Sequence, residues 1–84
     1  NLIDVSNHTI EVYPIPSFGQ LNIKSNKKIK SITVTDLTGK SLKSFYPINN
    51  NNLNLDLSNM SSGHYNLKFE TEKSIIFKQF ILNK

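Results

Sequence analysis

The sequence predicts an all-β domain, and three observations carry this prediction. Ten isoleucines, three valines and five threonines supply β-branched side chains, which suit a pleated sheet surface. Alanine, the strongest helix former, is absent. Short runs of alternating apolar and polar residues recur between turn signals, at the spacing of about 8–12 residues that is typical of sandwiches. We therefore expect an immunoglobulin-like antiparallel β-sandwich of about seven strands in a Greek key.

The first two strands are expected near the start of the chain. Residues Ile10–Tyr13 form the first one, which ends at Pro14 and Pro16 because proline cannot donate to a strand ladder. Leu21 and Ile23 alternate with polar residues and predict a second strand over 20–24. The polar residues 25–28 are then expected to form a turn.

A hairpin is predicted next. Ile32 and Val34 on one face of residues 29–36 indicate a half-buried third strand. Residues 36–40 read as its turn, in which Gly39 can take the positive φ that such turns require. The fourth strand returns over 40–46.

Three strands are predicted in the second half. Pro47 and residues 49–52 form a loop, 53–57 form the fifth strand, and 58–63 form a compact turn. The sixth strand, 63–71, alternates between apolar and polar faces. The last strand, 74–83, is apolar on both faces, which is typical of a central or covered strand.

Composition excludes several classes of function. The chain has 84 residues, enough for one domain, and it contains no cysteine for a disulfide or a thiolate metal site. Its net charge of +4 comes wholly from lysine. Because nucleic-acid readers depend heavily on arginine, we expect no nucleic-acid partner. No apolar stretch approaches the roughly 20 residues of a membrane-spanning helix.

Residues that could perform chemistry are scattered. His8 and His64 lack the spacing of metal ligands, and Glu70 with Glu72 more often marks a solvated edge than an acid/base pair. We therefore predict no catalytic residue, no metal and no cofactor. Lys24, Lys27, Lys28 and Lys30 cluster around one turn. Protection of a sheet edge is the favoured interpretation, and contact with an anionic lipid or polysaccharide is the alternative.

Five motifs occur in a fixed order along the chain. They are Tyr13-Pro14-Ile15-Pro16 with Gly19 ahead of Leu21-Asn22-Ile23, Asp36-Leu37-Thr38-Gly39-Lys40, Leu55-Asp56-Leu57-Ser58, Gly63-His64-Tyr65-Asn66-Leu67, and Lys78 in an apolar final strand. This order resembles the type A C-terminal sorting domain of the type IX (Por) secretion system of Bacteroidetes. The resemblance covers about residues 11–84. One position departs from it, because Ile15 stands where that family usually has asparagine.

The resemblance implies a non-catalytic address at the end of a larger secreted protein. Its expected partners are the translocon and shuttle components of the system, a cell-surface sortase-like protease that removes the domain, and a cargo domain in the same chain. We expect a monomer that is exported from the periplasm to the cell surface or medium. Residues 1–9 would be a linker remnant and 10–84 the sorting domain.

The resemblance also marks individual residues as recognition or fold motifs. Pro14 and Pro16 would stiffen the chain, Gly39 and Gly63 would satisfy turn dihedrals, and Tyr65 would lie in the core with its hydroxyl at the rim. The full set is Tyr13, Pro14, Pro16, Gly19, Asp36, Gly39, Lys40, Gly63, Tyr65 and Lys78.

A second class of function stays open at this point. Sandwich domains that bind carbohydrate or protein are common accessories of secreted enzymes. Exposed coplanar aromatic rings would favour this alternative, and Phe18, Phe45 and Tyr46 are the candidates.

Overall fold

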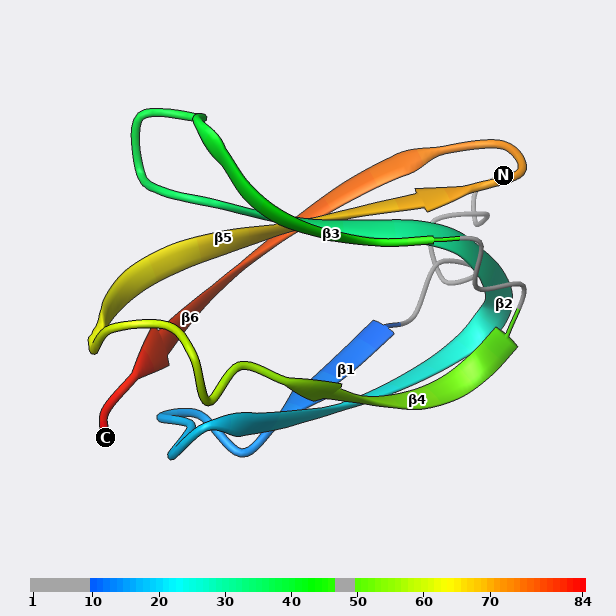
Figure 1. The fold of residues 1–84 in the computed structure, drawn as a ribbon. Helices are drawn as coiled ribbons and strands as arrows, with labels where there is room; N and C mark the ends of the chain where they lie inside the picture. The colour runs from blue at the N-terminus through cyan, green and yellow to red at the C-terminus, as the bar shows by residue number, and fades with distance from the viewer. Residues whose placement is uncertain (1–9, 47–49) are drawn as a thin grey trace.

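The computed structural model describes residues 10–46 and 50–84, and this part of the chain is built from antiparallel strands (Figure 1). It contains no helix long and apolar enough to cross a membrane. The strands are β1 (Ile10–Tyr13), β2 (Gln20–Thr35), β3 (Ser41–Phe45), β4 (Asn50–Asp56), β5 (Gly63–Thr71) and β6 (Ile75–Leu82).

The long strand β2 organises the sheet. Its first half lies between β1 and β4, so that Ile23 is paired with Val12 on one side and Leu53 on the other. Its second half lies between β3 and β5, so that Ile32 is paired with Phe45 and Phe69. Strand β6 then pairs with β5.

Two strands predicted separately, with a turn over 25–28, are in fact one. The Ser25 hydroxyl accepts a hydrogen bond from the Lys27 amide (3.0 Å) and donates one to the Lys27 carbonyl (2.7 Å). The ladder with β4 shifts register between Lys24 and Ile29. The polar stretch therefore makes an irregularity that bends β2 without reversing it, because an extra residue in a ladder bends a strand and increases its twist.

The curl of the sheet replaces the expected sandwich. Six strands form one sheet whose two halves, joined through β2, face one another (Figure 1). The all-β antiparallel class is confirmed, but a seven-stranded sandwich is not. The expected loop over 49–52 was also wrong in part, since β4 begins at Asn50. Pro47 lies outside the described residues.

One core fills the curl. Its largest fully buried side chains are Phe69 and Phe80, with exposed fractions of 0% and 1%. Both halves of the sheet contribute side chains to this core, because alternate residues of a strand point to the same face. The other buried apolar residues are Ile10, Leu21, Ile23, Ile29, Ile32, Val34, Leu55, Leu57, Leu67 and Leu82.

Strand β6 is the main surprise. Its two apolar faces predicted a central or covered position, but β6 lies at the end of the strand order, next to β5 alone. Its inner residues Phe80 and Leu82 are buried, whereas Ile75, Phe77 and Ile81 are exposed. The prediction was wrong because the apolar outer face is not used by the described part of the fold.

Candidate functional site

A proline segment (residues 14–19) joins the start of the chain to its final strand. Ser17 is completely buried and forms a parallel bridge with Leu82. The Ser17 amide donates to the Ile81 carbonyl (2.8 Å), and the Asn83 amide donates to the Ser17 carbonyl (2.7 Å). This bridge ties one end of β6 to the segment between β1 and β2.

The Ser17 side chain also shapes the turn that follows. Its hydroxyl donates to the Gln20 carbonyl (2.6 Å) and accepts from the Gly19 amide (3.2 Å). Gly19 is buried with φ of +134°, where an L side chain would be strained. Its carbonyl accepts the Leu57 amide (2.7 Å), so the proline segment also holds the end of β4.

The loop between β4 and β5 is closed from two sides. The Tyr65 hydroxyl donates to the Ser61 carbonyl (2.5 Å), and its ring stacks on Phe80 at 5.6 Å between centroids. Lys84 reaches the same loop: its Nζ donates to the carbonyls of Ser58 and Met60. The expectation that Tyr65 packs on the core with its hydroxyl at the rim is confirmed.

Gly63 does not serve as expected. It opens β5 and pairs with Leu82, and positive φ is found among the described glycines at Gly19 and Gly39. A Cβ at Gly63 would lie 3.5 Å from the Tyr65 hydroxyl, an ordinary contact distance. The expected turn dihedral was therefore wrong, and Gly63 is an ordinary strand residue next to Tyr65.

The hairpin between β2 and β3 is held by one carboxylate. Asp36 Oδ1 accepts from the Thr38 amide (2.9 Å), the Thr38 hydroxyl (2.6 Å) and the Lys40 amide (3.0 Å). Hydrogen bonds from Thr38 and Lys40 lower the pKa of Asp36 below its usual value, since they favour the charged form. Gly39 has φ of +95°, as predicted for this turn.

A second carboxylate acts similarly after β4. Asp56 accepts a hydrogen bond from the Ser58 amide (3.0 Å), and its hydrogen bonds with Ser58 lower the pKa of Asp56. Lys43 Nζ donates to the Asp56 carbonyl (3.2 Å). Both acids, the half-buried Asp36 and the exposed Asp56, support turns. Among residues 10–46 and 50–84 no group of three or more histidines, cysteines and acids could hold a metal ion.

Most of the motif residues gather at one end of the molecule. In Figure 1 the hairpin between β2 and β3 lies at the upper left of the molecule, and the loop before β5 and the C-terminus lie at its lower left. Gly63 and Tyr65 pair with Leu82 and Phe80 at the end of β6, and Pro16 and Gly19 flank the stretch that contains Ser17, which bridges to Leu82. Tyr13, Pro14 and Ile15 precede them on the exposed surface. Ser17 and Lys84 were missed by the sequence analysis, and only the position of Ser17 between a proline and a glycine could have signalled its role.

Lys78 lies apart from this end, in the middle of β6. It pairs with the buried Leu67, so its side chain starts on the core face of the sheet, but it is exposed. A lysine at the rim of an edge strand can cover apolar surface with its stem while its charge stays in water. A charged side chain on the inward face of an edge strand also discourages pairing with other chains.

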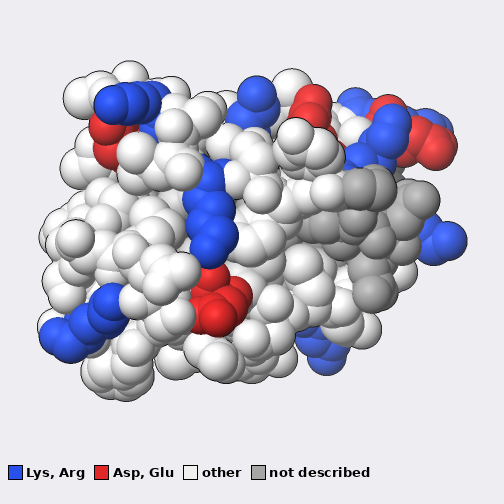
Figure 2. Space-filling view, in the orientation of Figure 1, with Lys and Arg blue, Asp and Glu red and all other residues white. Residues whose placement is uncertain are grey.

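The lysines expected to protect a sheet edge lie along the bend of β2, where all four are exposed: Lys24, Lys27, Lys28 and Lys30. Lys24 is paired on both sides, with Glu11 of β1 and Asn52 of β4, whereas Lys27 and Lys28 fall in the gap between the two halves of the ladder. On the face shown in Figure 2, lysines are spread over the surface, and those at the right end lie among acidic side chains. This face presents no single basic patch.

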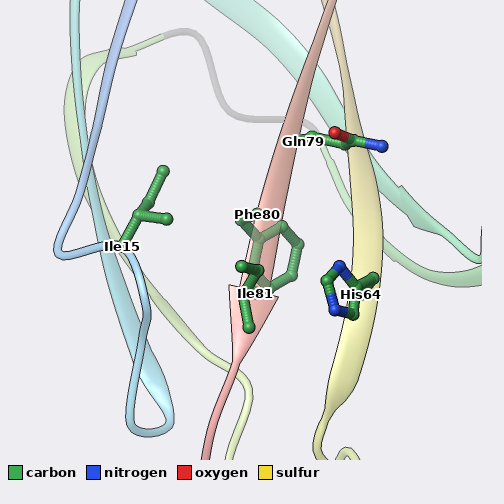
Figure 3. A pocket seen from close by; sticks show the side chains of 5 residues that line it. All are labelled: Ile15, His64, Gln79, Phe80 and Ile81. Atoms are coloured by element: carbon green, nitrogen blue, oxygen red, sulfur yellow. The ribbon is translucent and has the colours of Figure 1, made fainter.

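A shallow hollow of about 290 Å³ lies between the proline segment and β6. Ile15 borders it on one side, and Ile81, Phe80 and Gln79 of β6 with His64 of β5 border the other (Figure 3). Its lining is mainly apolar. Ile15 stands where the family named in the sequence analysis usually has asparagine, and its side chain forms an apolar wall of this hollow.

Comparison with known families identifies the domain. The model of the family described as "Secretion system C-terminal sorting domain" matches residues 11–83. The chain belongs to this family. No curated protein matches the sequence. The sorting domain is thus a C-terminal secretion signal for type IX secretion, a role that implies export across the envelope and contact with the secretion machinery.

Proposed function

We propose that this sorting domain is the non-catalytic address of a larger cargo protein, read in its folded form at the outer membrane and then removed by a sortase-like protease. The translocon and its shuttle components would be the partners that read it. Residues 1–9 would form the linker to the cargo, and 10–84 the signal. The observation that carries the proposal is the family match over 11–83.

The arrangement of the motif residues supports reading in the folded state. The backbone hydrogen bonds of Ser17 to Ile81 and Asn83 join segments that are far apart in the sequence. The hydrogen bonds of Asp36 and Tyr65 fix local turns. An unfolded chain would not bring these segments to one end. We assign the motif residues at this end to shaping the surface, and Lys78 to direct contact with the apparatus.

The accessory binding module is the weaker candidate. Phe45 packs against the core rather than standing free. Phe18 and Tyr46 are exposed but lie beside different halves of β2. Phe18 precedes the start of β2, whereas Tyr46 follows β3, which pairs with the second half of β2. These rings do not form the shared aromatic platform that carbohydrate binding would favour.

Export of a reporter tests the proposal. The chain is fused to the carboxyl end of a periplasm-targeted fluorescent protein and expressed in a type IX-competent cell, with a translocon-deficient strain beside it. We expect the reporter outside the competent cell and inside the deficient one. If the fusion stays in the periplasm while an established sorting domain exports the same reporter, the sorting function is refuted and the binding module takes its place.

A further inference from the structure

One edge of β6 has no strand beside it. Strand β6 pairs with β5 along its length, and its other edge is joined to the proline segment at Leu82 through Ser17. Among the described residues, no strand is paired with that edge from Ile75 to Phe80. The backbone groups that point along this edge are therefore available to an added strand.

The outer face of the same strand is apolar without serving the described core. Ile75, Phe77 and Ile81 have exposed fractions of 52%, 63% and 38%. On the neighbouring strand the outer face is polar, since Phe77 pairs with Lys68 and Ile81 with His64. Three exposed apolar side chains therefore share the outer face of a strand with a free edge, with Gln79 between Phe77 and Ile81, and such a surface suits a partner.

Charge decides between partners. The sequence of β6 is IIFKQFIL, with Lys78 as its one charge and no acid. A second copy paired antiparallel about the middle of this edge would place the two Lys78 side chains on one face, opposite or diagonal to each other. Like charges in such positions are destabilising, whereas an acidic side chain there is attracted.

We propose that the free edge of β6 accepts an extended segment of a partner by strand addition, with an acidic side chain of that segment facing Lys78. Apolar side chains on the outer face of the added strand would pack beside Phe77, and one near its end would enter the hollow between Ile15 and Ile81. This mode of recognition takes its affinity from main-chain hydrogen bonds and its selectivity from alternate side chains. The inference rests on the proposed function in one respect, that the partner belongs to the secretion apparatus.

A titration followed by nuclear magnetic resonance tests the pairing. The probe is an eight-residue peptide in which valines and threonines alternate, so that the threonines lie on the core face of the added strand. Aspartate replaces the threonine that would face Lys78. Its matched control has lysine there. We expect the aspartate peptide to shift the amide signals of residues 75–80 and to bind about fivefold more tightly than the lysine peptide, as cross-strand charge pairs imply.

A charge swap gives the control. Lys78→Glu should reverse the preference between the two peptides, whereas Lys30→Glu, at an exposed position of β2, should leave it unchanged. Backbone methylation of the peptide on its pairing edge should abolish the shifts. Binding without charge preference, shifts confined to residues away from β6 and the hollow, no shifts at all, or a dimer in sedimentation would each overturn the proposal.

The two proposals fail separately. Wild-type export is measured without the peptides, and peptide binding without the secretion system. If the wild type and Lys78→Glu are exported equally, the strand-addition site is refuted as the recognised surface while the sorting function stands. If the wild type is not exported, the sorting function fails whatever the peptides do.

Discussion

Strands β5 and β6 pair along eight positions, but the sheet uses them differently. Strand β5 has a neighbour on each side, buries Leu67 and Phe69, and turns Lys68 and Glu70 outward. Strand β6 has a neighbour on one side, and neither of its faces keeps the pattern of an apolar core face and a polar outer face. Its core face carries the exposed Lys78, and its outer face carries the exposed Phe77.

The difference separates folding from recognition. Every feature of β5 follows from burying one face of a sheet and solvating the other. The outer residues of β6 gain nothing from the described core, and exposing them raises the risk of unwanted association. A surface that carries this liability is better explained by a partner than by stability.

The largest effect expected from this comparison is on stability. Phe69→Ala in β5 should lower the free energy of unfolding by about 3–5 kcal/mol, because it removes a fully buried ring and leaves a cavity. Phe77→Ala in β6 should change it by about 0.5 kcal/mol or less, since the ring is mainly exposed. Chemical denaturation measures both. Equal losses would contradict the assignment of the two faces.

The bridge at Ser17 should have an intermediate effect. Ser17→Ala removes a buried hydroxyl that bonds with Gln20 and Gly19, which should cost about 1–3 kcal/mol. Ser61→Ala, at an exposed position of the nearby loop, is the matched control. A thermal melt of both variants checks the difference. If the two variants melt alike, the closure of β6 by the proline segment contributes little.

Acid should weaken the turns. The folded-state pKa of Asp36 is below its ordinary value of 3.8, so its carboxylate stabilises the fold above pH 3.8 and this contribution is lost as pH falls through the lower folded value. Asp36→Asn keeps an acceptor oxygen but cannot titrate. The melting temperature of this variant should fall less steeply with acid than that of the wild type. If the two melting temperatures fall in parallel as pH is lowered, Asp36 does not cause the acid sensitivity.

The smallest effect on stability is expected at Lys78. Lys78→Ala should leave the free energy of unfolding within about 0.5 kcal/mol, because the side chain is exposed. Export of the fused reporter should nevertheless be lost. Unchanged melting together with unchanged export would make Lys78 an ordinary surface residue.

Local patterns predicted most elements well. The bounds of β1 and β5 agree with the sequence analysis, as do the Asp36 hairpin and the positive φ of Gly39, because alternation and turn chemistry depend on neighbouring residues. The continuity of β2 could not be read in this way. A polar stretch with serine predicts a turn, and only the pairing of both its flanks shows that the strand bends instead of reversing.

The candidate site was harder to predict than the fold. The motif residues were named from the sequence, but their gathering at one end depends on the curl of the sheet. Two apolar faces on β6 indicated burial, since periodicity records side-chain chemistry and not whether a neighbour covers it. The bridge from Ser17 to β6 and the contacts of Lys84 arise between segments more than 20 residues apart, and the position of Ser17 between a proline and a glycine is the one local signal of them.

Export of Phe77→Ser tests most directly whether the outer face of β6 is read by a partner. Leu42→Ser is the matched control, because Leu42 is also exposed, at 43%, but lies on β3 at another edge of the sheet. Reporter outside the cell is measured for each variant and normalised to folded protein from a melting curve. We predict that both variants melt like the wild type and that export is lost for Phe77→Ser alone. Equal export of both folded variants would contradict recognition through β6.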